Sequence, residues 1–160
     1  MPSYQARQSA IHGKGVFATQ DIKKGERVLE YKGRRLTHKE ADRIYAGGAD
    51  TGHTFLFTLN DYYVIDANVG GNAARFINHS CAPNCESICI EDEDGHPERE
   101  RVYIEAKRNI KAGEELGYSY FITLEEAHTA RLKKIWECCC GARTCTGTML
   151  TSKKRKVATA

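Results

Sequence analysis

The 160-residue sequence lacks a membrane-length apolar run, a charged-then-apolar leader, an internal repeat and a long linker. A membrane helix needs about 20 predominantly apolar residues, and a secretory leader places an apolar stretch behind a basic start. These absences argue against a membrane or secreted protein. A chain of this length without a linker is about one domain. We therefore expect a single soluble, intracellular domain.

Cysteine, by contrast, is abundant, with seven residues in the chain. Disulfide frameworks belong to oxidising compartments and normally use an even number of cysteines. An odd count in a chain without a leader indicates metal binding or thiol chemistry instead.

Charge is unevenly distributed, although the net charge is only +3. Residues 91–100 contain six acidic residues and one arginine, and residues 153–156 read Lys-Lys-Arg-Lys. The acidic run is interpreted as a solvated hairpin loop, with a patch that attracts a basic peptide as the alternative. The basic cluster is typical of a solvated chain end, a nuclear import signal or a contact to nucleic-acid phosphates.

Periodicity predicts a mostly β protein with short helices. The segment Thr37-x-x-Glu40 forms a capping box for a helix over residues 38–46, and Thr123-x-x-Glu126 does so for a helix over residues 124–136. The second helix is expected to present an apolar face of Ala127, Leu132, Ile135 and Trp136. Residues Asn60-Asp61 predict a hairpin connection between two β-prone runs. Gly13 and Gly15 are interpreted as a turn that precedes a β-prone run ending at Ala18, and strands are expected over residues 27–33, 54–59, 62–67, 87–91 and 101–106.

Three motifs contain most of the chemically reactive residue types. The stretch Arg75–Cys85 reads RFINHSCAPNC, with more polar and soft-ligand side chains than a core segment tolerates without partners. Gly113–Tyr120 reads GEELGYSY, and Cys138–Cys145 reads CCCGARTC. Three such motifs in one order are a stronger signal than any one of them alone.

Together these motifs resemble the SET-domain protein lysine methyltransferases, and residues 71–85 look most like the trithorax type. The resemblance covers residues from about 10 to 150 and includes no pre-SET domain, as in the compact forms of bacteria and viruses. Ser119 stands where the family usually has Asp. The resemblance implies a SET fold, with small sheets around a knot-like active site, and a C-terminal post-SET zinc loop. It divides the chain into a SET domain (3–122), a linking helix (123–136), the zinc loop (137–151) and a basic tail (152–160).

The family's catalytic tyrosine corresponds to Tyr120 in this sequence. Lysine has a pKa of about 10.4, and an apolar aromatic channel disfavours its cation. The resemblance places Tyr118 and Phe55 beside the substrate amine, with Phe55 at a position where the family often has Tyr. The resemblance implies that Tyr118 occupies the position that the family uses as a switch for product multiplicity, whereas Phe55 frees room beside the amine. We therefore expect mainly mono- with some dimethylation.

The resemblance also implies two bound groups. S-adenosylmethionine is expected to contact Lys14, Gly15, Val16, Arg75, Phe76, Asn78, His79 and Tyr120. Structural zinc is expected to bind Cys81, Cys138, Cys140 and Cys145 and so to tie the post-SET loop onto the cofactor and substrate pocket. Cys85 is an alternative zinc ligand and Cys139 a weaker one.

The predicted function is methylation of a lysine in a basic protein, such as a histone tail or a bacterial DNA-packaging protein. The cell compartment would then be a nucleus or a bacterial nucleoid. The alternative is a SET-fold peptide- or nucleic-acid-binding module with weak or no turnover, suggested by Ser119 and Phe55. The basic tail suggests a third class, a zinc-bearing nucleic-acid binder.

Overall fold

The computed structural model describes residues 2–11, 13–45, 55–120 and 130–150. Strands predominate and the helices are short, so the predicted fold class is confirmed. The strands are β1 (Tyr4–Gln8), β2 (Lys14–Ala18), β3 (Arg27–Glu30), β4 (Arg34–Thr37), β5 (Leu56–Thr58), β6 (Tyr63–Asp66), β7 (Asn78–His79), β8 (Cys85–Ile90), β9 (Arg101–Ala106) and β10 (Gly117–Tyr118). The helices are α1 (His38–Ile44), α2 (Ala130–Ile135) and the 3₁₀ helices η2 (Ala73–Phe76) and η3 (Pro97–Arg99).

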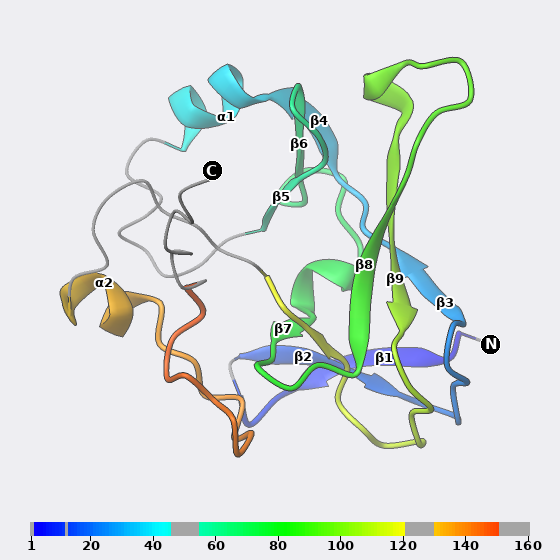
Figure 1. Cartoon of the computed structure of the whole chain (residues 1–160), viewed down its shortest axis with the longest axis vertical. Coiled ribbons are helices and arrows are strands. Elements are labelled where there is room, and N and C mark those ends of the chain that lie inside the picture. The colour runs from blue at the N-terminus through cyan, green and yellow to red at the C-terminus, as the bar shows by residue number, and fades with distance from the viewer. Residues whose placement is uncertain (1, 12, 46–54, 121–129, 151–160) are drawn as a thin grey trace, which may run out of the picture.

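The strands form several small sheets instead of one large one (Figure 1). Strands β1 and β2 make an antiparallel hairpin, and β3, β9 and β8 make a three-stranded antiparallel sheet. Strands β4, β6 and β5 form a second three-stranded sheet. The two-residue strands β7 and β10 pair in parallel.

One hydrophobic core joins these sheets. Along β9, Val102, Ile104 and Ala106 are buried, as the two-residue repeat of a strand with one covered face requires. The same core receives Val16 from β2 and Leu116 from the segment before β10. The cysteine motif at Cys138–Cys145, by contrast, follows α2. Trp136 and Leu150, on either side of this motif, form a separate small hydrophobic cluster.

Local sequence signals account for several elements. Thr37 Oγ1 accepts a hydrogen bond from Glu40 N at 3.1 Å, which confirms Thr37 as the N-cap of the predicted helix, although the helix ends at Ile44 and not at residue 46. Asn60 Oδ1 accepts from the backbone amides of Tyr62 and Tyr63 at 2.9 Å each, and these bonds stabilise the predicted turn between β5 and β6. The second capping box, at residues 123–126, lies outside the described residues.

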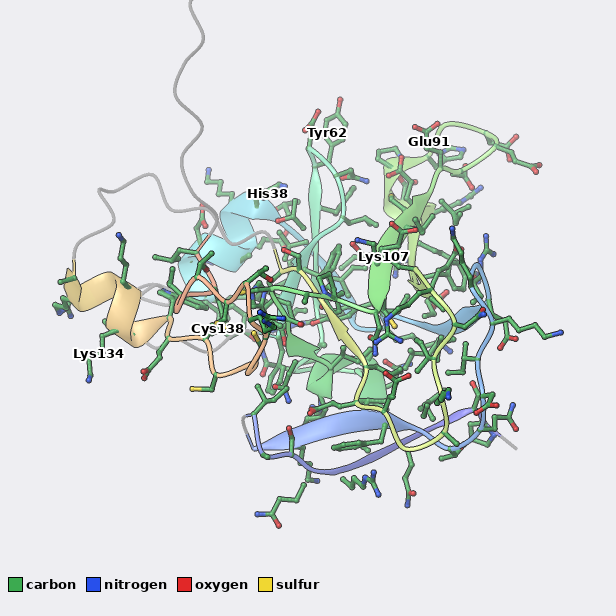
Figure 2. The ribbon with its side chains drawn as sticks, turned by 60° about the horizontal axis from the view of Figure 1, so that its bottom comes forward. His38, Tyr62, Glu91, Lys107, Lys134 and Cys138 are labelled. Carbon is green, nitrogen blue, oxygen red and sulfur yellow. The ribbon has the colours of Figure 1, made fainter. Side chains whose placement is uncertain are left out.

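The acidic run forms the loop between β8 and β9, as predicted. Asp92 Oδ2 accepts from the amides of Asp94 and His96, which closes the turn. This hairpin projects from the body away from α2 (Figure 1), and Glu91 lies far from Cys138 in Figure 2. A role of this loop in attracting a basic peptide stays a prediction.

The predicted fourfold division of the chain also stays a prediction, because residues 121–129 and 151–160 are not described. None of the described helices combines the length and apolar character of a membrane-crossing helix.

Candidate active site

The central motif and the second motif meet in the pairing of β7 with β10. Asn78 lies opposite Gly117, and His79 lies opposite Tyr118. A Cβ atom on Gly117 would lie 3.0 Å from the Cβ of Ser80, so the close approach favours glycine. Because this pairing is parallel, it aligns the two motifs in the same direction and sets Tyr120 beside His79.

A pocket of about 530 Å³ opens beside this pairing. It brings together most of the predicted cofactor-binding residues: Lys14, Arg75, Phe76, Asn78, His79 and Tyr120. Phe55 lines it as well. Gly15 and Val16 are not on this wall: Val16 is fully buried in the core, and the α-carbon of Gly15 faces the Glu115 side chain. Their contact with a cofactor stays a prediction.

The segment after α2 forms a wall of this pocket, where the resemblance implied that zinc would hold the post-SET loop. Ile135, Trp136 and Met149 line it. Met149 N donates to the Trp136 carbonyl at 2.7 Å, which folds the segment after the cysteine motif back on α2. The available signal was the apolar pair Ile135-Trp136 directly before the cysteines, which predicted a buried face but not what it covers.

Tyr120 has a fixed orientation. Its hydroxyl donates to the Ile77 carbonyl, and its backbone amide donates to His79 Nδ1 at 3.0 Å. The Tyr120 ring packs at 5.3 Å from the His79 ring and at 5.0 Å from the Tyr118 ring, between centroids. Burial raises the pKa of the Tyr120 phenol, so the hydroxyl stays protonated at neutral pH.

The predicted channel aromatics lie next to one another. Tyr118 is buried against Tyr120 and Phe57 and is not on the wall of the 530 Å³ pocket. Phe55 packs edge-on against Phe76 at 6.0 Å. Tyr31, which the sequence did not single out, fixes this arrangement because its hydroxyl donates to the Phe55 carbonyl at 3.0 Å. Burial raises the pKa of Tyr118 well above its ordinary value, so this group of rings is uncharged.

Two cations flank the ring of Phe76 at the pocket wall. The guanidinium carbon of Arg75 lies 4.6 Å from the ring centroid, and Lys14 Nζ lies 5.1 Å from it. Arg75 also donates to the Ala67 carbonyl at 3.3 Å. Cation–π contacts of this kind hold charged side chains in place. The wall therefore suits the anionic part of a ligand.

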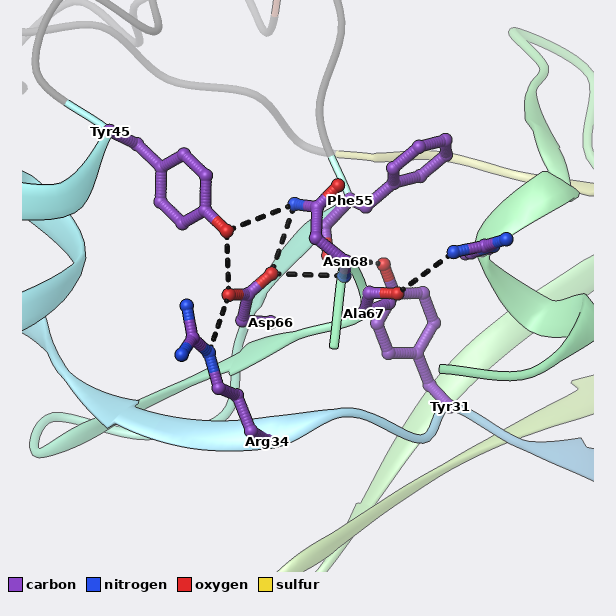
Figure 3. A network of polar contacts seen from close by, with 8 residues as sticks. Tyr31, Arg34, Tyr45, Phe55, Asp66, Ala67 and Asn68 are labelled. Atoms are coloured by element: carbon purple, nitrogen blue, oxygen red, sulfur yellow. Dashed lines mark hydrogen bonds and ion pairs between the residues drawn. The ribbon is translucent and has the colours of Figure 1, made fainter. Parts of the chain in front are cut away.

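A buried carboxylate supports the segment that holds Phe55 (Figure 3). Asp66 is fully buried and accepts hydrogen bonds from Arg34 Nε at 2.9 Å, from the Tyr45 hydroxyl at 2.7 Å and from Asn68. Burial by itself raises the pKa of Asp66, but the hydrogen bonds from Tyr45, Asn68 and Arg34 outweigh it and bring the pKa below its ordinary value. The network joins β4, the end of α1 and the turn after β6.

Asp66→Asn should lower the free energy of unfolding by about 2 kcal/mol, because hydrogen bonds to a charged group are lost in a buried site. The pKa of Asp66 is lowered in the folded protein, so its contribution is complete above the unfolded pKa of about 3.9 and is lost as the pH falls through the folded pKa. Urea unfolding at pH 7 and at pH 3 measures both effects. The difference between the two proteins should shrink at pH 3.

The matched control is Glu105→Gln, which removes a carboxylate that pairs with Arg27 at 3.0 Å on the surface. Exposed pairs contribute about 0–1 kcal/mol, so this variant should stay close to wild type. An Asp66→Asn variant as stable as Glu105→Gln would show that the network adds nothing to stability.

The structure gathers four cysteine thiols at one point. Sulfur atoms of Cys81, Cys138, Cys140 and Cys145 all lie within 4.8 Å of one another. Cys81 follows β7, whereas the other three follow α2, and Figure 2 shows Cys138 where that loop meets the body. The sulfur of Cys81 is 3.8 Å from that of Cys138 and 3.9 Å from that of Cys145. Zn–S bonds of about 2.3 Å in a tetrahedron give S···S edges of about 3.8 Å, so the cluster fits a tetrahedral metal ion.

The remaining candidate ligands lie outside this group. Cys85 is buried on β8, where burial raises the pKa of its thiol to about 12 and keeps it protonated. Cys139 is exposed and lines the pocket. Desolvation raises the pKa of Cys140, but hydrogen bonds from the backbone amides of Cys81 and Ala142 outweigh it and lower the pKa, which favours the thiolate that a metal binds.

Comparison with known proteins defines the class. The SET domain family matches residues 13–121, and the chain belongs to this family. The four-cysteine cluster, with Cys81 inside the matched region and the other three cysteines after it, is of the post-SET kind that accompanies such domains.

The curated relatives are large proteins. Human histone-lysine N-methyltransferase 2B is 40% identical over 141 residues, which are 86% of this chain and 5% of the human protein. Histone-lysine N-methyltransferase trithorax of Drosophila virilis is 41% identical over 140 residues, or 86% of this chain and 3% of that protein. The histone-lysine N-methyltransferase, H3 lysine-4 specific, of Schizosaccharomyces pombe is 40% identical over 141 residues, which are 87% of this chain and 14% of that protein. The chain thus spans only a small part of the length of these relatives.

Proposed function

We propose that this chain transfers a methyl group from S-adenosylmethionine to a lysine side chain of a basic protein, with a histone H3 tail as the first substrate to test. The observation that supports it most is the convergence of Tyr120, Lys14 and Arg75 on one pocket closed by the cysteine-bearing segment. The relatives, named histone-lysine N-methyltransferases, support the same activity.

The pocket fits the cofactor in size and chemistry. Its volume of about 530 Å³ lies within the range of about 300–1,000 Å³ typical of small-molecule sites. The cations Lys14 and Arg75 suit a carboxylate, and the apolar wall of Ile135 and Trp136 suits an aromatic base. When bound, S-adenosylmethionine supplies an electrophilic methyl group on a sulfonium for in-line displacement by the lysine amine.

The residues of the chain would align the reacting groups and exclude water from them. Tyr120 holds its hydroxyl toward the Ile77 carbonyl. Its ring packs against the buried ring of Tyr118, which in turn contacts the partly buried ring of Phe57. This uncharged environment disfavours the ammonium form of the substrate lysine and favours the neutral amine that attacks the methyl group. The proposal requires no further acid or base among the described residues, because the lysine amine loses its proton to solvent before it enters the site.

The four thiols of Cys81, Cys138, Cys140 and Cys145 would hold structural zinc. With all four positions taken by protein ligands, such a site has no open position for catalysis. Its role would be to tie the segment that contains Trp136 and Met149 to β7, and so to complete the pocket wall.

The proposal is tested by incubating the protein with isotope-labelled S-adenosylmethionine, recombinant histone H3 and a bacterial DNA-packaging protein, followed by mass spectrometry of labelled peptides. Label on one lysine of H3 is the expected result, and H3 with that lysine changed to arginine is the control. A histone substrate would place the protein in a nucleus, and a DNA-packaging protein would place it in a nucleoid. A protein that binds the cofactor but labels no lysine would be the SET-fold binding module.

Tyr118→Phe should shift the products from mono- and dimethyl-lysine toward di- and trimethyl-lysine without loss of turnover. The hydroxyl of Tyr118 can hold a water in the space that a further methyl group needs, and removing it frees that space. Product distributions on a lysine peptide at early time points measure the change. Tyr63→Phe, on β6, is the control that should leave the distribution unchanged. Wild-type protein that already makes trimethyl-lysine at early times would contradict the switch.

A further inference from the structure

The turn before β2 forms one wall of the pocket and begins at Ser9. Ile11, Gly13 and Lys14 of this segment line the pocket. Ser9 N donates to the Gly13 carbonyl at 2.8 Å, and Ile11 N donates to Ser9 Oγ at 3.0 Å. The backbone and hydroxyl of Ser9 therefore set the shape of this wall. Ser9 precedes the region that the SET domain family matches.

The hydroxyl of Ser9 is in turn attached to the second motif. Ser9 Oγ donates to Glu115 Oε1 at 2.7 Å, and Asn78 Nδ2 donates to the same oxygen at 2.9 Å. Asn78 Nδ2 also lies 3.2 Å from the Lys14 carbonyl and 3.3 Å from Ser9 Oγ. One carboxylate oxygen thus joins three segments: the turn before β2, β7 and the residue pair before β10.

Gly15 makes the contact between Ser9 and Glu115 possible. A Cβ atom there would collide with the carboxylate of Glu115 and would lie 2.9 Å from the Cβ of Ser9. The absence of a side chain at position 15 lets Glu115 reach across β2 to Ser9. Hydrogen bonds to a carboxylate are roughly twice as strong as neutral ones, so this contact is suited to hold a turn that has few buried side chains of its own.

We propose that Ser9 and Glu115 form a clamp that positions the pocket wall of Ile11, Gly13 and Lys14 and thereby sets the affinity for the adenosyl cofactor. Both are positioning residues, since neither lines the pocket. The inference rests on the proposed function, because the ligand is the cofactor of that reaction.

The test uses binding of S-adenosylhomocysteine, measured by calorimetry, so that no turnover is required. Ser9→Ala should weaken binding about 10-fold, the loss expected for one hydrogen bond to a charged group. The KM for the lysine peptide should stay within about twofold, because the clamp lies on the cofactor side. Thr19→Val is the matched control: it removes a hydroxyl that donates to the Pro2 carbonyl at 3.0 Å, at the other end of the β1–β2 hairpin, and should not change binding.

Glu115 provides a second, independent variant. Glu115→Gln keeps an acceptor oxygen for Ser9 and Asn78 and should retain most of the affinity, whereas Glu115→Ala should lose about as much as Ser9→Ala. The double variant of Ser9→Ala with Glu115→Ala should lose little more than either one, because contacting residues are not additive. Thermal unfolding of each variant verifies that it is folded.

The outcomes separate the two proposals. If wild-type protein binds S-adenosylhomocysteine and Ser9→Ala binds it equally well, the clamp is wrong and the proposed function stands. The clamp is also wrong if Thr19→Val weakens binding as much, or if the peptide KM rises in parallel. If wild-type protein does not bind S-adenosylhomocysteine, the proposed function fails and the clamp fails with it.

Discussion

Tyr120→Phe should leave the protein folded and lower kcat on the order of 10²–10³-fold, the loss seen when one oriented hydrogen-bond donor is removed from an active site. The change deletes only the hydroxyl that contacts the Ile77 carbonyl, while the ring keeps its packing against His79 and Tyr118. The hydrogen bond from the Tyr120 backbone amide to His79 is also kept. Because the phenol stays protonated, the expected loss concerns orientation and not acid–base catalysis.

Initial rates of methyl transfer, together with S-adenosylhomocysteine affinity and circular dichroism, measure the effect. Tyr62→Phe is the control, because it also removes one tyrosine hydroxyl. Tyr62 is 65% exposed at the tip of the β5–β6 hairpin, far from the rings around Tyr120. Undiminished rates in Tyr120→Phe would mean that another residue orients the reaction. A fall in rate that accompanies unfolding would likewise not support the assignment.

The residues of the candidate site could be predicted where chemistry restricts the residue type at a position. Cysteines that bind a metal, and a tyrosine whose hydroxyl is needed, remain recognisable in a sequence because few other residues replace them. Lys14, Arg75, His79 and Tyr120 were predicted from the resemblance of their motifs to the family, and the structure places them around one pocket.

The rest could not be predicted, because it depends on which segments come together in space. Asp66 lies near the end of a β-prone run, and the sequence gave no sign that Arg34 and Tyr45, from two distant segments, would donate hydrogen bonds to it. Gly15 was expected to contact a cofactor, but the close approach of Glu115 is the constraint that the structure shows. Trp136 was expected on an apolar helix face, and only the fold reveals that the face borders the pocket.

Local signals were more informative for β9 and for the β5–β6 turn than for the segment after α2. The alternation on β9 and the turn at Asn60 specify their structures through neighbours in sequence, so they were predicted correctly. The segment after α2 has a small apolar cluster of its own, and the four thiols come from two segments that lie far apart in sequence. Its conformation is therefore determined by contacts that no local pattern contains.

Cys140→Ser should release the metal and open the pocket wall. Loss of one thiolate from a four-thiolate site should lower zinc affinity by more than about 100-fold, since even changes outside the ligand set cost about 10–100-fold. Structural zinc stabilises folded zinc-finger peptides by about 10–16 kcal/mol, and this loop likewise has few apolar contacts to replace it. Binding of S-adenosylhomocysteine should fall with the metal, because Trp136 and Met149 of the same segment line the pocket.

The single tryptophan of the chain makes this effect directly visible. Trp136 is only 4% exposed and packs against Leu150, so release of the loop should shift its fluorescence to longer wavelength. Metal content of the purified protein, Trp136 emission and S-adenosylhomocysteine affinity should change together in Cys140→Ser, and a chelator should produce the same shift in wild type. Cys89→Ser, on β8, changes an exposed thiol outside both the cluster and the pocket and should change none of the three. A Cys140→Ser protein with full metal content and unchanged emission would exclude Cys140 as a ligand and, with it, the role of the metal in holding the pocket wall.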